Sequence, residues 1–162
     1  MGAKETAGPI SRDLQVIVVR TAGQMEDALS IRRAVFIAEQ GVTETEEIDA
    51  YDGDPALVAD ALHVVAYVDG RPAATGRLLL DTPLTGNAHI GRIAVVQEHR
   101  RRGLGRTVML ALQREALRRG YPGVTIAAQL QAVPFYERLG YRAYGEIFLD
   151  ARIEHRMMEL PL

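Results

Sequence analysis

Four arginines and two glycines lie within residues 97–108, QEHRRRGLGRTV, directly before an apolar helical pattern. The start of a helix carries unpaired backbone N–H groups and the positive end of the helix dipole. Gly103 and Gly105 would let a bulky anion approach this backbone, and the arginines would add charge-assisted hydrogen bonds. Because bare positive charge opposes the dipole, the segment predicts a phosphate-binding loop.

Other interpretations of this loop fit the sequence less well. A nucleoside-triphosphate loop needs Gly-Lys-Ser/Thr, but Arg106 and Thr107 follow Gly105. A dinucleotide fingerprint needs a third glycine, where the chain has Val108. The net charge is −2 and no stacking aromatics flank the arginines, which argues against nucleic acid. A solvated basic helix end stays open as the plain alternative.

The pattern of apolar residues predicts one mixed α/β (α+β) domain in the order β-α-β-β-β-α-β-α-β-β, with a sheet of about seven strands and flanking helices. Asp69-Gly70 is a hairpin signal, and Gly120 and Gly140 are helix stops. We expect residues 1–12 to form a loose tail and 13–162 the single domain. The expected strands are 13–20, 61–68, 71–80, 88–96, 121–129, 141–149 and 154–160, and the expected helices are 23–40, 103–119 and 132–140.

Composition excludes several classes of protein. The chain has 162 residues, of which 48% are hydrophobic and 25% charged, as is usual for a globular domain. Cysteine is absent, so disulfides, thiolate metal sites and a cysteine nucleophile are excluded. The histidines are scattered and the acids lack calcium-loop spacing, so no metal site is expected. No apolar run is long enough to span a membrane, and a cytoplasmic protein is expected.

Two motifs in the expected order resemble the GCN5-related N-acetyltransferase (GNAT) family. Arg100-x-x-Gly103-x-Gly105 follows the strand GRIAVV, and AQLQAVPFYERLGY at residues 128–141 resembles the second signature of the family. Further similarity is to the ElaA-like branch and covers residues 32–158. It rests on RRAVFIAEQGV, Asp49, Asp52, His63, Arg92 and FLDARIEHRMM. The branch usually has Ile-Pro-His where this chain has Ile153-Glu154-His155.

The resemblance implies that acetyl-CoA binds without a metal. In the family the pyrophosphate lies on the backbone of the glycine loop, while the pantetheine arm pairs with the preceding strand like an added strand. Arg101 or Arg106 is a candidate partner for the 3′-phosphate. The implied cofactor-binding residues are Ile93, Ala94, Val95, Arg100, Arg101, Arg102, Gly103, Leu104, Gly105, Arg106, Gln129 and Tyr136.

The implied reaction is direct attack of a primary amine on the thioester. Tyr136 matches the family's general acid, which would protonate the leaving thiolate, whereas Phe135 and Tyr141 are interpreted as packing residues. At reference pKa values that transfer is uphill by roughly 2 kcal/mol, so the site must perturb one group or use a hydrogen bond. The plain alternative for Tyr136 is a packed ring with a satisfied hydroxyl.

Three residues are candidates for the general base that deprotonates the amine. Glu39 ends the first expected helix, and His63 and His155 titrate near neutrality. Glu39 has a structural alternative, an ion pair with Arg77 or Arg92. His63 has a structural alternative inside its strand. We interpret His89 and His99 as surface residues.

The acceptor is the least defined part of the prediction. Residues 41–60 contain seven acids and no Lys or Arg, and most of these acids are expected to lie in a solvated loop. The negative charge of residues 44–54 favours a cationic acceptor such as a polyamine, an aminoglycoside or a lysine side chain. A small-molecule amine is the expected partner, and a homodimer is one expected assembly. The alternative function is a CoA-binding regulatory or interaction module with little catalytic activity.

Overall fold

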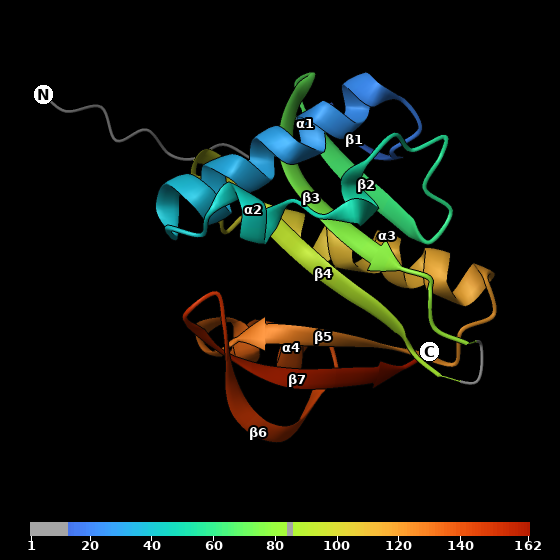
Figure 1. The fold of residues 1–162 in the computed structure, drawn as a ribbon, viewed down its shortest axis with the longest axis vertical. Coiled ribbons are helices and arrows are strands. Elements are labelled where there is room, and N and C mark those ends of the chain that lie inside the picture. Colours follow the sequence, from blue (N-terminus) through green and yellow to red (C-terminus); the bar gives the residue numbers. More distant parts are fainter. Residues whose placement is uncertain (1–12, 84–85) are drawn as a thin grey trace, which may run out of the picture.

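The computed structural model describes residues 13–83 and 86–162, and the tail expected at 1–12 lies outside them. Its centre is a seven-stranded mixed sheet in the order β1-β2-β3-β4-β5-β7-β6 (Figure 1). Of the strand pairs in these residues, β4–β5 is parallel and the others are antiparallel. The predicted fold class is confirmed. The strands are β1 (Leu14–Val18), β2 (Ala61–Val68), β3 (Arg71–Leu79), β4 (Ala88–Val95), β5 (Gly123–Gln129), β6 (Arg142–Asp150) and β7 (Ile153–Pro161).

Local signals explain where most elements begin and end. Asp69 and Gly70 both have positive φ, 51° and 76°, as the tight β2–β3 turn requires. Thr21 caps α1 in a reciprocal capping box with Gln24. Gly120 stops α3 with a φ of 88°. The helices are α1 (Ala22–Arg32), α2 (Glu44–Glu47), α3 (Leu104–Arg118) and α4 (Val133–Arg138).

The first helix does not stay α-helical to residue 40 as its pattern predicts. From Arg33 to Glu39 the backbone is a π-helix, so each turn contains an additional residue. The prediction of an α-helix with 3.6 residues per turn is therefore wrong for residues 33–39. The wider turn changes the direction of the side chains from Val35 to Gln40, several of which line the cavity described below.

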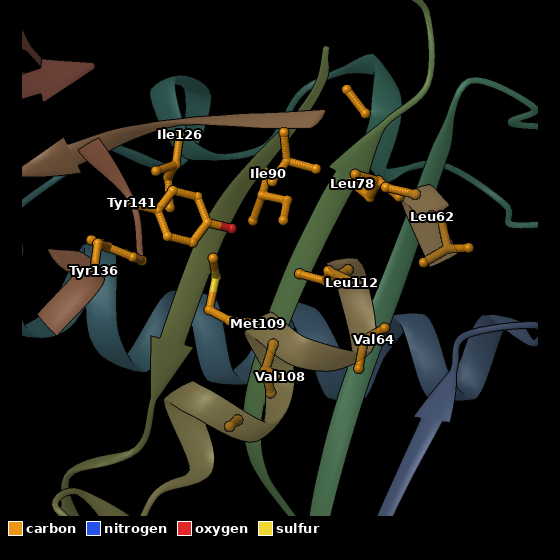
Figure 2. Packing of buried hydrophobic residues seen from close by; sticks show 14 of the residues in the cluster. Leu62, Val64, Leu78, Ile90, Val108, Met109, Leu112, Ile126, Tyr136 and Tyr141 are labelled. Atoms are coloured by element: carbon orange, nitrogen blue, oxygen red, sulfur yellow. The ribbon is translucent and has the colours of Figure 1, made fainter. Parts of the chain in front are cut away.

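Helices cover both faces of the sheet with separate apolar clusters. α3 packs on one face through Val108, Met109 and Leu112, all fully buried. α1 packs on the other face through Met25, Ala28 and Ile31. Figure 2 shows α3 side chains against Leu78 and Ile90, with Tyr136 and Tyr141 beside Ile126. No helix among the described residues has the length and apolar character needed to cross a bilayer.

Strand β4 contains a bulge. Gly91 pairs with Arg77 and Ala94 with Thr75, so Arg92 and Ile93 both oppose Gly76. Arg92 has a φ of 55° there. The additional residue reverses the alternation of β4 side chains between the two faces of the sheet. Ile90 and Ile93 both pack with the α3 cluster, and Ala94 packs with the α1 cluster.

Candidate active site

The site is the gap where β4 and β5 separate. The two strands pair from Ala88 and Val124 only as far as Ile90 and Ile126, yet both continue to Val95 and Gln129. The backbone of this second half of β4 is therefore free to pair with an extended ligand on the side of β5. A cavity of about 850 Å³ fills the gap.

The loop before α3 closes one end of the cavity. Arg101 and Gly103 have left-handed φ values of 64° and 82°, and Gly103 caps α3 without any side-chain hydrogen bond. The first N–H groups of this 15-residue helix therefore have no capping side chain. Gly105 faces Phe135, whose Cζ would lie 3.3 Å from an added Cβ. The loop residues that line the cavity are Arg100, Arg101, Gly103, Leu104, Gly105 and Arg106, whereas Arg102 is not among them.

Arg100 is already engaged by protein groups. Its Nη2 lies 2.8 Å from both carboxylate oxygens of Glu39, and its Nε donates to the Val95 carbonyl at 3.0 Å. It therefore connects the loop to the end of the π-helix and to the end of β4. The prediction that Glu39 pairs with Arg77 or Arg92 is wrong, because those arginines bind other acids.

Tyr136 lies on α4 and lines the same cavity at 6% exposure. Its ring makes edge contacts with Phe135 at 5.0 Å and Tyr141 at 5.8 Å. Burial raises the pKa of Tyr136 above the usual value for a tyrosine, so the hydroxyl keeps its proton well above neutral pH. Tyr141 donates instead to Gln113 Oε1 at 2.9 Å, in keeping with a packing role.

His155 also lines the cavity, and its hydrogen bond shows which ring nitrogen carries the hydrogen. Nδ1 lies 2.7 Å from the Ile153 carbonyl, which can only accept, so Nδ1 carries the hydrogen. Nε2 of the neutral ring then carries the lone pair. Phe148 stacks on this ring at 5.8 Å, and the side chain is 8% exposed.

His89 is one of two cavity-lining histidines that were expected at the surface. It is half-buried in the part of β4 that pairs with β5, opposite Thr125, and it lines the cavity. Its Nδ1 lies 3.1 Å from Thr125 Oγ1. Burial lowers the pKa of His89, with Arg77 and Arg92 acting in the same direction, so the ring is neutral at pH 7. Alternation was the usable signal, since Ala88 and Ile90 point to the core and leave His89 on the other face.

His63 is not brought to the cavity. Its Nε2 lies 3.0 Å from the Tyr51 carbonyl and 3.8 Å from Asp52 Oδ1, at the border of a smaller pocket. His99, expected at the surface, is partly buried and lines the main cavity. Within residues 13–83 and 86–162, no group of three or more His, Cys, Asp or Glu side chains has an arrangement that could hold a metal ion.

Five of the seven acids of residues 41–60 are exposed, as expected for most of them. The segment is nevertheless not only loop, since it forms α2 and a 3₁₀ turn at Ala50–Asp52, and Glu47 and Asp52 are buried at 4% and 7% exposure. Their partners are arginines distant in sequence. Arg32 binds Glu47 and Asp52, Arg77 binds Asp49 and Asp52, and Arg92 binds Glu47.

The strand gap, the uncapped glycine-rich helix start and the buried tyrosine belong to one cavity. Residues 38–162 match the family model described as an acetyltransferase (GNAT) domain. The chain therefore belongs to the GNAT family of acetyltransferases.

Similar proteins cover most of the chain. An uncharacterized N-acetyltransferase of Bacillus subtilis, YjcF, is 36% identical over 146 residues, which cover 90% of this chain and 98% of YjcF. An acyl-CoA N-acyltransferase structure from Pseudomonas aeruginosa matches with a TM-score of 0.75 and 30% identity, covering 90% of this chain and 98% of that one. Escherichia coli ElaA shares the fold with a TM-score of 0.77 and 23% identity, covering 90% of this chain and 98% of its own.

Proposed function

We propose that this protein transfers the acetyl group of acetyl-CoA to a primary amine by direct attack. The observation that carries the proposal is the separation of β4 and β5 beyond Ile90 and Ile126, which opens the cavity between the α3 loop and Tyr136. An extended, peptide-like arm ending in a phosphate group fits such a gap. The arm would pair with β4 at Ile93, Ala94 and Val95.

The residues of the loop suit the phosphate end of that ligand. The N–H groups after Gly103 lack a capping side chain and can bind the pyrophosphate. Arg101 and Arg106 are exposed beside the cavity and can reach a further phosphate. Arg100 is held by Glu39, so we assign it to shaping the loop and Glu39 to positioning Arg100.

The chemistry then needs one base and one hydrogen-bond donor. The amine nitrogen attacks the carbonyl carbon, the C–N bond forms and the C–S bond breaks. A proton leaves the nitrogen for Nε2 of His155, and the thiolate accepts a hydrogen bond from Tyr136, because the raised pKa of this tyrosine disfavours full transfer of its proton. The released thiolate then takes its proton from solvent. Only about one in 2,500 molecules of an amine with pKa ~10.4 is neutral at pH 7, so a base accelerates the reaction.

Two of the expected base candidates are not used in this scheme. The carboxylate of Glu39 forms an ion pair with Arg100, and His63 lies outside the cavity. His89 is the alternative base, because its neutral ring lies at the narrow end of the gap. Gln129 has its amide bonded to Gln40 and Gln131, so binding a pantetheine amide would require it to exchange partners.

The test is release of free CoA from acetyl-CoA in the presence of a panel of primary amines, with mass spectrometry of the products. Acetylated amine that appears with the wild-type protein and falls strongly with Tyr136→Phe supports the proposal. Tight acetyl-CoA binding without acetylation of any amine favours the CoA-binding module instead.

A further inference from the structure

Within the acidic segment, the carboxylates next to the cavity are bound by arginines of the chain itself. Arg32, Arg77, Arg92, Glu47, Asp49 and Asp52 form one ion-pair cluster with three positive and three negative charges. The shortest of its contacts joins Arg32 Nη1 and Asp52 Oδ1 at 2.7 Å. A cationic ligand would have to compete with these arginines for the acids.

The other carboxylates of this wall are paired in the same way. Glu39 is bound by Arg100 at 2.8 Å. Glu46 is bound by Arg152 of the β6–β7 turn, through contacts of 2.8 and 3.1 Å. Among the lining carboxylates of the described residues, Asp150 alone has no ion pair, and it is exposed at the end of β6, where water screens its charge.

Apart from two cations, Arg92, which is paired with Glu47, and the exposed Arg138, the remaining wall of the cavity away from the α3 loop is mostly apolar. Val35 and Phe36 come from the π-helix, Val42 follows it, and Ile153 begins β7. Val35 and Val42 are each 6% exposed. Gln40 and Gln129 face each other through reciprocal amide hydrogen bonds.

We propose that the acceptor is a monoamine whose arm beyond the reacting nitrogen is aliphatic or aromatic and uncharged. This inference rests on the proposed acetyl transfer. A second ammonium placed against Phe36 and Ile153 would lose water without gaining a carboxylate. An apolar wall also lowers the pKa of the reacting amine, because desolvation disfavours its charged form. The arrangement argues against the polycationic acceptor that the acidic segment suggested.

Two amines of equal length test the inference. Pentylamine and putrescine have the same number of heavy atoms, and the terminal methyl of one replaces the second ammonium of the other. We expect kcat/KM for pentylamine to exceed that for putrescine by at least about tenfold, the lower bound for one well-buried methylene. A putrescine value equal to or above that for pentylamine would overturn the inference and leave acetyl transfer intact.

Failure of the underlying proposal looks different. If acetyl-CoA binds but no amine of the whole panel is acetylated, these two included, the acetyltransferase proposal fails, and the inference fails with it. Variants at Phe36 then test whether this apolar wall contacts the acceptor. Phe36→Ala, with Phe36→Leu as the milder change, should lower kcat/KM for pentylamine at least fivefold while the KM for acetyl-CoA stays constant. Leu57→Ala, at a side chain 82% exposed, is the matched control and should change neither value. An unchanged kcat/KM in both Phe36 variants would overturn the assignment of this wall.

Discussion

Arg32 and Asp52 form a bidentate ion pair inside the protein, with Nη1–Oδ1 at 2.7 Å and Nη2–Oδ2 at 2.8 Å. Their side chains are 1% and 0% exposed. Arg32 ends α1 and Asp52 ends the 3₁₀ turn, so the pair fixes the acidic segment to the first helix. Through Glu47 the same cluster reaches Arg92 at the bulge of β4, which places the segment beside the cavity.

Replacing Asp52 should therefore be costly. Asp52→Asn leaves Arg32 and Arg77 buried without a full counter-charge, and we expect the free energy of unfolding to fall by about 3–5 kcal/mol. Urea denaturation followed by circular dichroism measures it. Glu115→Gln, which removes a surface pair with Arg118, is the control and should cost about 0–1 kcal/mol. Similar small losses in both variants would show that the cluster is not stabilising.

The same carboxylate should make stability depend on acid pH. Burial would raise the pKa of Asp52, but hydrogen bonds and charge from Arg32, the Asp49 N–H and Arg77 hold it below its usual range. The folded state therefore binds this proton more weakly than the unfolded state, whose Asp pKa is about 3.9. The contribution is complete above that value and is lost as the pH falls below it. We expect a shallower loss of stability with falling pH for Asp52→Asn than for the wild type, and parallel curves would contradict the assignment.

Removing the hydroxyl of Tyr136 should affect turnover and spare binding. Tyr136→Phe keeps the buried ring and deletes the proposed hydrogen-bond donor, so kcat should fall about 10²–10⁴-fold with little change in the Kd of acetyl-CoA. Tyr141→Phe is the matched control, since it also deletes a tyrosine hydroxyl beside Tyr136. Equal turnover in the two variants would remove Tyr136 from the mechanism.

Single substitutions separate the base candidates. His155→Gln deletes the proposed base and should lower kcat/KM about 10²–10⁴-fold. His63→Gln, outside the cavity, should retain activity. If His89→Gln lowers kcat/KM by this factor while His155→Gln retains activity, the base is His89 rather than His155.

Gly76 should not accommodate a side chain, because it lies opposite the bulge of β4. An added Cβ would lie 2.6 Å from Ile93 Cδ1, 2.7 Å from Leu112 Cδ1 and 2.8 Å from Val108 Cγ1. Gly76→Val should lower the free energy of unfolding by about 1–3 kcal/mol and weaken acetyl-CoA binding through the displaced Ile93. Gly23→Ala, with open space around it on α1, is the control and should be neutral or stabilising by up to about 1 kcal/mol. A Gly76→Val protein as stable as the wild type would contradict this packing.

The local parts of the fold were predictable because their causes are adjacent in the sequence. The turn at Asp69-Gly70 and the stop at Gly120 follow from backbone conformations that few other residues adopt. The glycine loop before α3 could also be placed, since its glycines and arginines lie within seven residues. These features require no knowledge of distant partners.

The parts that were missed depend on distant residues. Glu47 is buried only because Arg32 and Arg92 reach it, 15 and 45 residues away along the chain. The bulge at Arg92 depends on how β4 packs over β3, and no local pattern marks it. For His89, alternation places the side chain on the face opposite Ala88 and Ile90, but it does not reveal that this face borders a cavity.

The most direct test of the central claim is a calorimetric titration of the protein with acetyl-CoA and with its 3′-dephospho form. We expect saturable binding of acetyl-CoA, with weaker binding of the dephospho form because Arg101 or Arg106 loses its phosphate partner. Absence of binding at millimolar acetyl-CoA would contradict the proposed CoA site, and the loop before α3 would then be an ordinary helix start.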